Sequence, residues 1–180
     1  MKHIKLWDKE FEISLPYSEI HKTIQEMACT MKKDLEGKEV LFICILNGAF
    51  MFASELMKEM ELTDAEISFL KLTSYVGSES SGVIKELIGL NEEVAGRTVV
   101  ILEDIVDTGH TIHEVIKQFK HKGAKEVKIA TLLYKPDALK VEIKLDYVGL
   151  EIPSDFIVGF GLDYNRRGRN FKDIYTLVKE

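Results

Sequence analysis

Residues 99–111 read VVILEDIVDTGHT: an apolar run, a pair of carboxylates, a short polar turn and the first residues of a helix. The unbroken apolar run from Val99 to Leu102 is typical of a strand that is buried on both faces of a parallel sheet. Glu103 and Asp104 then fall at the carboxyl end of that strand, where open α/β sheets bind their ligands. This stretch predicts an α/β fold with a site at one edge of its sheet.

A helix is expected to follow, from about residue 112. Apolar residues recur over 112–119 with the spacing that places them on one core-facing side of a helix. Thr111 and Glu114 have the spacing of a capping box, which indicates the N-terminus of the helix. Gly123 suits the position just beyond its C-terminus. The whole stretch is therefore predicted to form a strand, a loop and a helix.

The loop between this strand and this helix has the chemistry of a phosphate site. Unpaired backbone N–H groups and the positive end of the helix dipole favour an anion there. Gly109 lets the backbone approach a ligand closely, and Thr108 and Thr111 add hydroxyl donors. Glu103 and Asp104 would repel a phosphate, so we expect them to face the vicinal hydroxyls of a sugar or a divalent cation. A phosphate beside a diol describes a ribose 5-phosphate.

Composition sets further bounds. The 180 residues are 46% hydrophobic and carry a formal net charge of −6 at pH 7. This length predicts a single domain, residues 1–180, with a sizeable core. The acidic balance disfavours nucleic acid and membranes as partners. Cys29 and Cys44 form no metal or disulfide pattern, and residues 1–12 lack the apolar stretch of a signal peptide, so we expect a cytoplasmic protein.

The middle of the chain alternates between apolar runs and helical patterns. Helices are predicted at about 18–35 and 49–60, and strands at 40–46, 66–73 and 126–134. Because strands and helices alternate across 38–134, we predict a doubly wound parallel sheet that is flanked by helices. The turn Asn47-Gly48 would then lie at the same edge of the sheet as the phosphate loop.

Residues 74–82 form the most loop-like stretch of the chain, rich in glycine and serine. The segments on either side of it, 66–73 and 83–89, are compatible with a long hairpin. The loop is then either a plain hairpin connection or a lid that closes over the site. The two ends of the chain are predicted to hold an extended arm over 1–15 and short strands at 11–15, 145–150, 155–160 and 174–178.

The stretch 99–111 resembles the phosphoribosyl-pyrophosphate (PRPP) signature of type I phosphoribosyltransferases. Together with the Ser74-Tyr75 loop, Lys135 and the segment 156–169, it makes the chain resemble the bacterial hypoxanthine (hypoxanthine-guanine) phosphoribosyltransferases. The resemblance implies a parallel-sheet core over about 38–150 and a small hood from about 1–15 and 151–180. It implies an enzyme that joins a 6-oxopurine to the ribose of PRPP, with magnesium as cofactor and release of pyrophosphate.

The resemblance also implies roles for individual residues. Asp107 would be the catalytic acid–base group near purine N7. Asp163 would bind magnesium and line the purine site, with Glu103 and Asp104 as further metal candidates. PRPP would be bound by Glu103, Asp104, Asp107, Thr108, Gly109, His110 and Thr111. Pyrophosphate would be bound by Asn47, Gly48, Ser74, Tyr75 and Arg169, and the purine by Lys135, Phe156, Ile157 and Asp163.

One position departs from the family pattern. The family usually has a basic residue before the glycine of the turn after the second strand, and here that residue is Asn47. The backbone of this turn is expected to bind pyrophosphate through an unusual cis peptide. Because the usual side-chain charge is missing, the contribution of Asn47 to pyrophosphate affinity and to any subunit contact is open.

Several alternatives remain at this stage. The same fold could serve a regulator that keeps a PRPP pocket and binds RNA or DNA, although the acidic composition disfavours it. An enzyme for another base, such as xanthine, is compatible with Lys135 and Phe156. A dinucleotide-binding oxidoreductase is disfavoured because no GxGxxG follows the first strand. The family resemblance further implies a homodimer or homotetramer.

Overall fold

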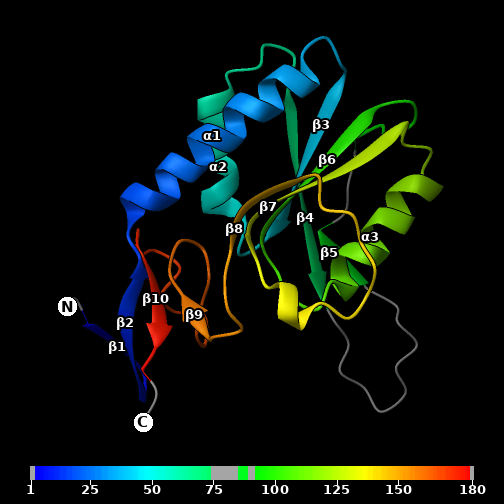
Figure 1. Cartoon of the computed structure of the whole chain (residues 1–180). Coiled ribbons are helices and arrows are strands. Elements are labelled where there is room, and N and C mark those ends of the chain that lie inside the picture. The colour runs from blue at the N-terminus through cyan, green and yellow to red at the C-terminus, as the bar shows by residue number, and fades with distance from the viewer. Residues whose placement is uncertain (1–2, 74–84, 89–91, 179–180) are drawn as a thin grey trace.

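A six-stranded sheet forms the centre of the molecule in the computed structural model, which describes residues 3–73, 85–88 and 92–178 (Figure 1). The strands lie in the order β5-β4-β3-β6-β7-β8. All neighbouring pairs are parallel except β5, which runs antiparallel to β4. The strand bounds are β3 Val40–Leu46, β4 Glu66–Thr73, β5 Lys85–Ile88, β6 Thr98–Val106, β7 Glu126–Tyr134 and β8 Tyr147–Glu151.

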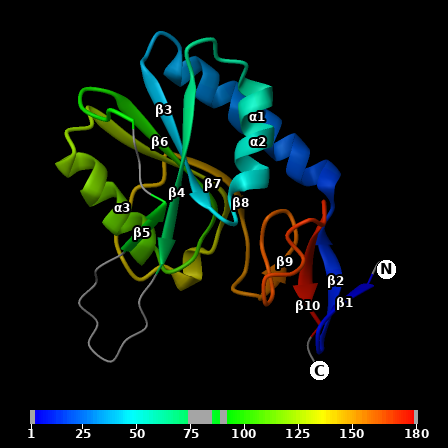
Figure 2. The same cartoon turned by 180° about the vertical axis from the view of Figure 1, so that it is seen from behind.

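Helices cover both faces of this sheet, as the predicted doubly wound fold requires. Helices α1 (Tyr17–Leu35) and α2 (Phe50–Met60) lie together on one face, and α3 (His110–His121) lies on the other (Figure 2). The apolar run of β6 divides between the two resulting cores. Val100 and Leu102 pack in the core under α1 and α2, whereas Val99 and Ile101 pack in the core under α3. Burial on both faces explains why this strand is apolar without alternation.

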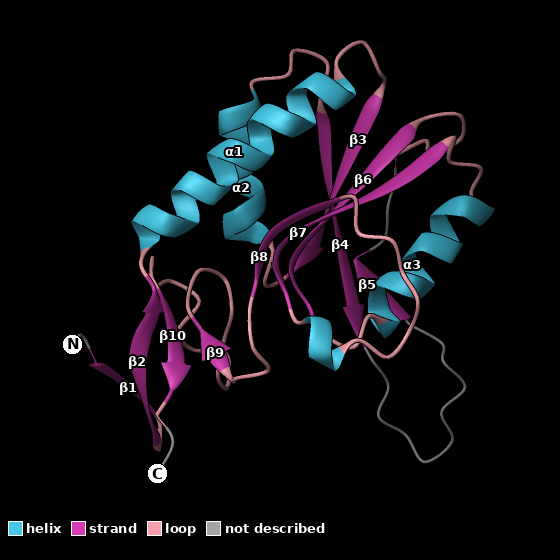
Figure 3. Cartoon of the chain, in the orientation of Figure 1, coloured by secondary structure: helices cyan, strands magenta, loops and turns pink. Residues whose placement is uncertain are grey.

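A second, antiparallel sheet lies beside the carboxyl ends of the parallel strands (Figure 3). It joins the two ends of the chain in the order β1-β2-β10-β9, and we call it the hood. Its strands are β1 His3–Leu6, β2 Lys9–Leu15, β9 Ile157–Val158 and β10 Ile174–Leu177. The hood has its own small core. It is tied to α1 because the buried Asp173 accepts a hydrogen bond of 2.9 Å from the backbone N–H of Tyr17.

The predicted strands 40–46, 66–73 and 126–134 have the bounds that the structure shows, and the hairpin of β4 with β5 is confirmed. The prediction at the ends of the chain was less accurate. Strand β1 was predicted only as an extended arm, and the strand expected at 155–160 is limited to β9. The loop 74–82, with its possible role as a lid, lies outside the described residues.

Two predictions around the organising stretch were wrong. Strand β6 continues through Val106, so the carboxylate pair lies within the strand and not after it. Helix α3 begins at His110, with Gly109 as its N-cap at φ 80°, and no described side chain caps it. The expected capping box does not form, because Thr111 lies inside the helix instead of at its N-cap. The Glu114 carboxylate pairs with Lys117 at 2.9 Å.

The predicted end of α3 is correct. Gly123 follows the helix with φ 84°, and the N–H of Ala124 donates to the carbonyl of Phe119 at 3.1 Å. This bond is typical of a Schellman motif, in which glycine in the left-handed conformation ends a helix. None of the described helices is long and apolar enough to cross a membrane.

Candidate active site

A pocket of about 250 Å³ lies between the carboxyl ends of the parallel strands and the hood. The parallel sheet supplies one side of it, from the ends of β6 and β7 and the turn after β3, and the segment 156–169 supplies the other. It brings together most of the residues that were predicted to bind purine, pyrophosphate and metal. Its lining residues are Gly48, Asp104, Ile105, Asp107, Lys135, Phe156, Ile157, Leu162, Asp163 and Arg169.

The turn after β3 forms the floor of the pocket. The peptide bond between Leu46 and Asn47 is cis, as the family resemblance implies. Gly48 lies so close to β6 that a Cβ there would collide with the carboxylate of Asp104. From the other side, a Cβ on Gly161 would collide with the carbonyl oxygen of Gly48. Both positions therefore require glycine for a close approach of backbone to its neighbours.

The carboxylate pair of β6 is held in an apolar environment. Burial, followed by the negative charge of Asp104, raises the pKa of Glu103 well above its usual range. Burial also raises the pKa of Asp104, to about 6, even though its Oδ1 accepts a hydrogen bond of 3.0 Å from the N–H of Ile105. Asp104 lines the pocket and Glu103 does not. Glu103 Oε2 is buried and has no hydrogen-bond partner in the described part of the chain.

Asp107 and Lys135 form a polar pair on the wall of the pocket. Lys135 is buried, and its Nζ donates a hydrogen bond of 2.8 Å to the carbonyl of Asp155 and lies 3.9 Å from Asp107 Oδ2. The Asp107 side chain is about half exposed and lines the pocket. The register of β6 with β7 causes this proximity, since Val106 pairs with Tyr134 just before each strand ends. An acceptor and a donor thus face one cavity.

Asp163 and Arg169 face this pair from the segment after the hood strand β9. Arg169 Nη2 lies 2.5 Å from Asp163 Oδ1, and Arg169 Nη1 donates to the carbonyl of Gly161 at 2.6 Å. Both charges also act on Asp104, whose pKa the guanidinium lowers and the second carboxylate raises. An anion that binds Arg169, or a cation that binds Asp163, must therefore either add to this ion pair or break it.

The aromatic wall of the pocket belongs to the hood. Phe156 is 46% exposed, and its ring packs edge-on against Tyr164, with centroids 5.8 Å apart, and tilted against Phe11. Ile157 follows in β9 and lines the same pocket. An exposed ring that is supported from behind is suited to stacking on a planar ligand.

Of the predicted phosphate loop, only Asp107 lines the pocket, and residues 108–111 lie beside it. Thr108 is half-buried, and His110 and Thr111 are exposed at the N-terminus of α3. Backbone N–H groups at the start of α3 are therefore available at the positive end of the helix dipole, as an anion site requires. Gly109 is buried, with Leu139 and Val141 close to where a Cβ would lie. The remaining predicted pyrophosphate ligands, Ser74 and Tyr75, lie outside the described residues.

Two lining residues were not predicted, Ile105 and Leu162. Both are apolar neighbours of predicted charged residues, and their positions next to Asp104 and Asp163 were the only available signal. Across 3–73, 85–88 and 92–178, no group of three or more His, Cys, Asp or Glu side chains could hold a metal ion. A metal at this site would therefore need ligands from substrate and water in addition to protein carboxylates.

Comparison with known proteins gives consistent matches over most of the chain. Residues 16–165 match the phosphoribosyl transferase domain family. The hypoxanthine-guanine phosphoribosyltransferase of Streptococcus thermophilus is 41% identical over 157 residues, 87% of each chain. That of Bacillus subtilis is 38% identical over 167 residues, 92% of each chain. The crystal structure of a hypoxanthine phosphoribosyltransferase from Staphylococcus aureus superimposes with a TM-score of 0.88 at 34% identity, covering 93% of this chain and 91% of that one.

Proposed function

Because the chain belongs to the phosphoribosyltransferase family, we infer that it is a purine-salvage enzyme that transfers ribose 5-phosphate from PRPP to hypoxanthine or guanine. The products are IMP or GMP and pyrophosphate. The observation that carries this assignment is the pair of Asp107 and Lys135, which places an acceptor and a buried cationic donor in one pocket. A 6-oxopurine offers N7–H and O6 on one edge, which match these two groups.

In the transfer, purine N9 forms a bond to C1′ of the ribose as the C1′–O bond to pyrophosphate breaks with its electron pair. Asp107 accepts the proton that N7 loses, so no charge accumulates on the base. Lys135 donates to O6, and Phe156 stacks on the ring while Ile157 lines the pocket beside it. The buried position of Lys135 supports this role, because its orientation is fixed by the carbonyl of Asp155 before a base arrives.

The 5′-phosphate of PRPP binds at the start of α3, to the backbone of residues 107–111 and the hydroxyls of Thr108 and Thr111. Glu103 and Asp104 hold the ribose hydroxyls. Asp104 lines the pocket, whereas Glu103 does not, and its Oε2 has no hydrogen-bond partner among the described residues. The free helix N-terminus is the feature that supports a phosphate there.

Pyrophosphate binds between Arg169 and the Asn47-Gly48 turn. The phosphoribosyltransferase family is in general magnesium-dependent, and Asp163 and Asp104 are the carboxylates of this pocket that fit such an ion. When bound between these carboxylates and the substrate, such an ion would supply positive charge for the leaving pyrophosphate. The Arg169 guanidinium matches phosphate oxygens in geometry and adds a fixed positive charge.

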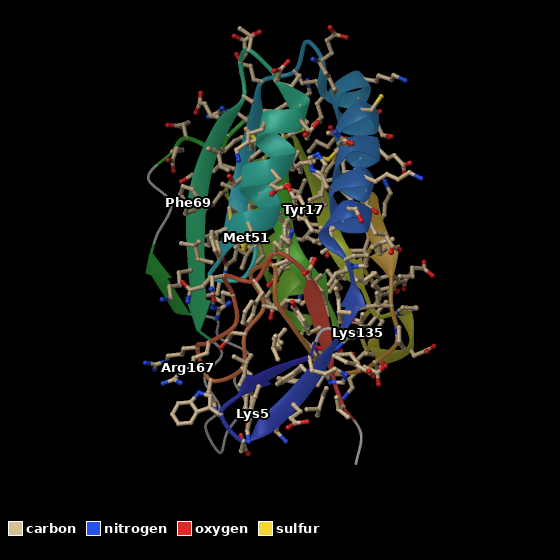
Figure 4. All side chains as sticks on the ribbon, turned by 90° about the vertical axis from the view of Figure 1, so that its left-hand side faces the viewer. Lys5, Tyr17, Met51, Phe69, Lys135 and Arg167 are labelled. Atoms are coloured by element: carbon tan, nitrogen blue, oxygen red, sulfur yellow. The ribbon has the colours of Figure 1, made fainter. Side chains whose placement is uncertain are left out.

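The 180 residues form one domain, with the hood built from the two ends of the chain. The enzyme acts in the cytoplasm, as a homodimer or homotetramer. Exposed apolar side chains support self-association: Phe50 of α2, and Ile67 and Phe69, which form an apolar patch on one face of β4. Helix α2 lies between β4 and α1 and leaves this part of the sheet uncovered (Figure 4). In the hypoxanthine phosphoribosyltransferase of Trypanosoma cruzi, the C-terminal region has a role in the oligomeric state and the enzymatic activity.

A base panel tests the assignment. Pyrophosphate release from PRPP is measured with hypoxanthine, guanine, xanthine and adenine in turn, with and without magnesium. Turnover with hypoxanthine or guanine that stops when the metal is chelated supports the enzyme and its cofactor. Turnover with xanthine and with no other base would show that the enzyme acts on xanthine instead of hypoxanthine or guanine. Binding of PRPP without turnover of any base would favour a regulator.

A further inference from the structure

The tip of the β1–β2 hairpin packs against a turn, residues 164–167, that lies outside the pocket. The guanidinium of Arg167 stacks over the indole of Trp7, 4.4 Å from the ring centroid. The next hairpin residue, Asp8, accepts a hydrogen bond of 2.9 Å from the Tyr164 hydroxyl through its Oδ1. Figure 4 shows Arg167 beside the strands of this hairpin. Two adjacent hairpin residues therefore hold the two ends of one turn.

The contact continues one residue further on each side. Leu6 is buried, and its Cδ1 lies only 2.9 Å from where a Cβ on Gly168 would stand. Gly168 has φ 96°, so any other residue there would be strained as well as crowded. The hairpin tip, residues 6–8, thus packs along the segment from 164 to 168.

The turn itself depends on such support. Tyr164 and Arg167 exchange backbone hydrogen bonds of 2.9 and 3.0 Å, which makes Asn165 and Arg166 its two central residues. Both have positive φ, 50° and 66°, although neither is glycine. Asparagine adopts the left-handed region readily, whereas arginine there is strained, so contacts around the turn must hold Arg166 in this conformation.

The same turn separates two charged residues of the pocket. Asp163 immediately precedes it, and the N–H of Arg166 donates to Asp163 Oδ2 at 2.6 Å. Arg169 follows the turn and pairs with Asp163 Oδ1. A change in the conformation of the turn would therefore move the carboxylate and the guanidinium relative to each other and to the sheet.

We propose that the hairpin tip, through Trp7 and Asp8, is a positioning element that fixes Asp163 and Arg169 in the orientation that binds the pyrophosphate end of PRPP. This inference rests on the proposed function for the roles of those two residues. The hairpin lies at the N-terminus of the chain, far from the signature stretch in sequence. It contacts Phe156 of the purine site through Phe11, in the middle of β2, and not through its tip. Changes at Trp7 and Asp8 leave that contact in place, so their effect should be specific for PRPP.

The test compares Trp7→Ala and Asp8→Ala with the wild type. We expect the KM for PRPP and the Kd of PRPP with magnesium, measured by calorimetry, to rise by about two- to fivefold for Trp7→Ala. For Asp8→Ala we expect a rise of about three- to tenfold. The KM for hypoxanthine should stay unchanged. Trp7→Phe retains a ring for Arg167 and should recover most of the affinity, and Lys5→Ala, on the exposed side of the same hairpin, should match the wild type.

Tyr164→Phe keeps the test independent of folding damage, because it removes one exposed hydroxyl and keeps the ring. It should raise the KM for PRPP as Asp8→Ala does, and the double variant should be no worse than either single one. Variants that lower the melting temperature but leave the KM and Kd for PRPP unchanged would overturn the positioning role. A wild type that binds PRPP but turns over no base would contradict the proposed function alone, and one that does not bind PRPP would contradict both.

Discussion

Arg169 Nη2 lies 2.5 Å from Asp163 Oδ1, so the guanidinium proposed to bind pyrophosphate is paired with the carboxylate proposed to bind magnesium. A second bond, from Arg169 Nη1 to the carbonyl of Gly161, keeps the guanidinium plane fixed. The pair is partly exposed, and its charges are balanced within the pocket. Binding of magnesium and pyrophosphate would replace this ion pair with two others, Asp163 with magnesium and Arg169 with pyrophosphate. Each side chain would therefore keep a counter-charge.

The first prediction follows from that pairing. Arg169→Ala removes a charge-assisted contact to phosphate and leaves Asp163 without its counter-ion. We expect the KM for PRPP to rise about tenfold or more, since such contacts contribute about 1.5–3 kcal/mol. Initial rates at varied PRPP concentration measure it. Arg166→Asn is the matched control, because Arg166 is exposed and asparagine tolerates its positive φ. An unchanged KM in Arg169→Ala would remove this residue from the site.

The second prediction concerns recognition of the base. Lys135→Met removes the buried ammonium and leaves the carbonyl of Asp155 without this donor. We expect the KM for hypoxanthine to rise about tenfold, with a much smaller change in the KM for PRPP. Lys125→Met, at an exposed lysine before β7, should behave as the wild type. If the PRPP KM changes and the hypoxanthine KM does not, Lys135 does not contact the base.

The third prediction is a pH dependence of stability at a cluster remote from the pocket. The Tyr147 hydroxyl of β8 donates to Asp34 of α1 at 2.7 Å, and Lys128 of β7 lies 3.4 Å from the same carboxylate. The Tyr147 hydrogen bond, followed by that of Lys128, lowers the pKa of Asp34. Because the folded-state pKa is below the unfolded one, the stabilisation is present above about pH 4 and is lost as pH falls through the folded-state pKa.

Thermal unfolding of wild type and Tyr147→Phe across pH 7 to 3 measures this effect. The substitution keeps the buried ring and removes the donor, so the wild type should melt higher at pH 7, and the difference should shrink on acidification below about pH 4. A difference that stays constant over this range would show that the ionised form of Asp34 contributes nothing through this bond.

The fourth prediction concerns the apolar patch on β4. Phe69 is 43% exposed and Ile67 37% exposed, on the face where α2 does not cover the sheet. If this patch joins copies of the chain, Phe69→Glu should convert the oligomer to monomers in analytical ultracentrifugation without loss of helix content. Val148→Glu changes a similarly exposed residue on the opposite strand, β8, and should leave the oligomer intact. If both variants remain oligomeric, the interface lies elsewhere on the chain.

The parts of the fold that the sequence predicted well are those that burial determines. Strand β3 coincides with its apolar run, and the buried part of β7 is likewise unbroken, because both faces of a central parallel strand must be apolar. Strand β4 instead alternates, with Ser68 and Leu70 buried and Ile67 and Phe69 exposed. The end of β6 was misplaced because Glu103 and Asp104 interrupt its apolar run while remaining in the strand. The start of α3 was misplaced because Gly109 takes the cap position through its backbone, which no side-chain pattern indicates.

The site could be predicted only as separate residues. The family resemblance, and not spacing, indicated the roles of Asp107, Lys135 and Arg169. The sequence could not indicate that Arg169 pairs with Asp163, because that contact depends on the turn between them. The sequence also could not indicate that Trp7 stacks on Arg167, because this contact joins residues from opposite ends of the chain.

Transfer of a proton from a 6-oxopurine to Asp107 as PRPP is consumed can be tested by one rate comparison. Pyrophosphate release with hypoxanthine, PRPP and magnesium is measured for wild type and Asp107→Ala, with the Kd of PRPP determined for both. We predict turnover by the wild type and a fall in kcat of about 10²- to 10⁴-fold in the variant, with PRPP binding largely retained. Equal kcat values for the two proteins would contradict this role of Asp107.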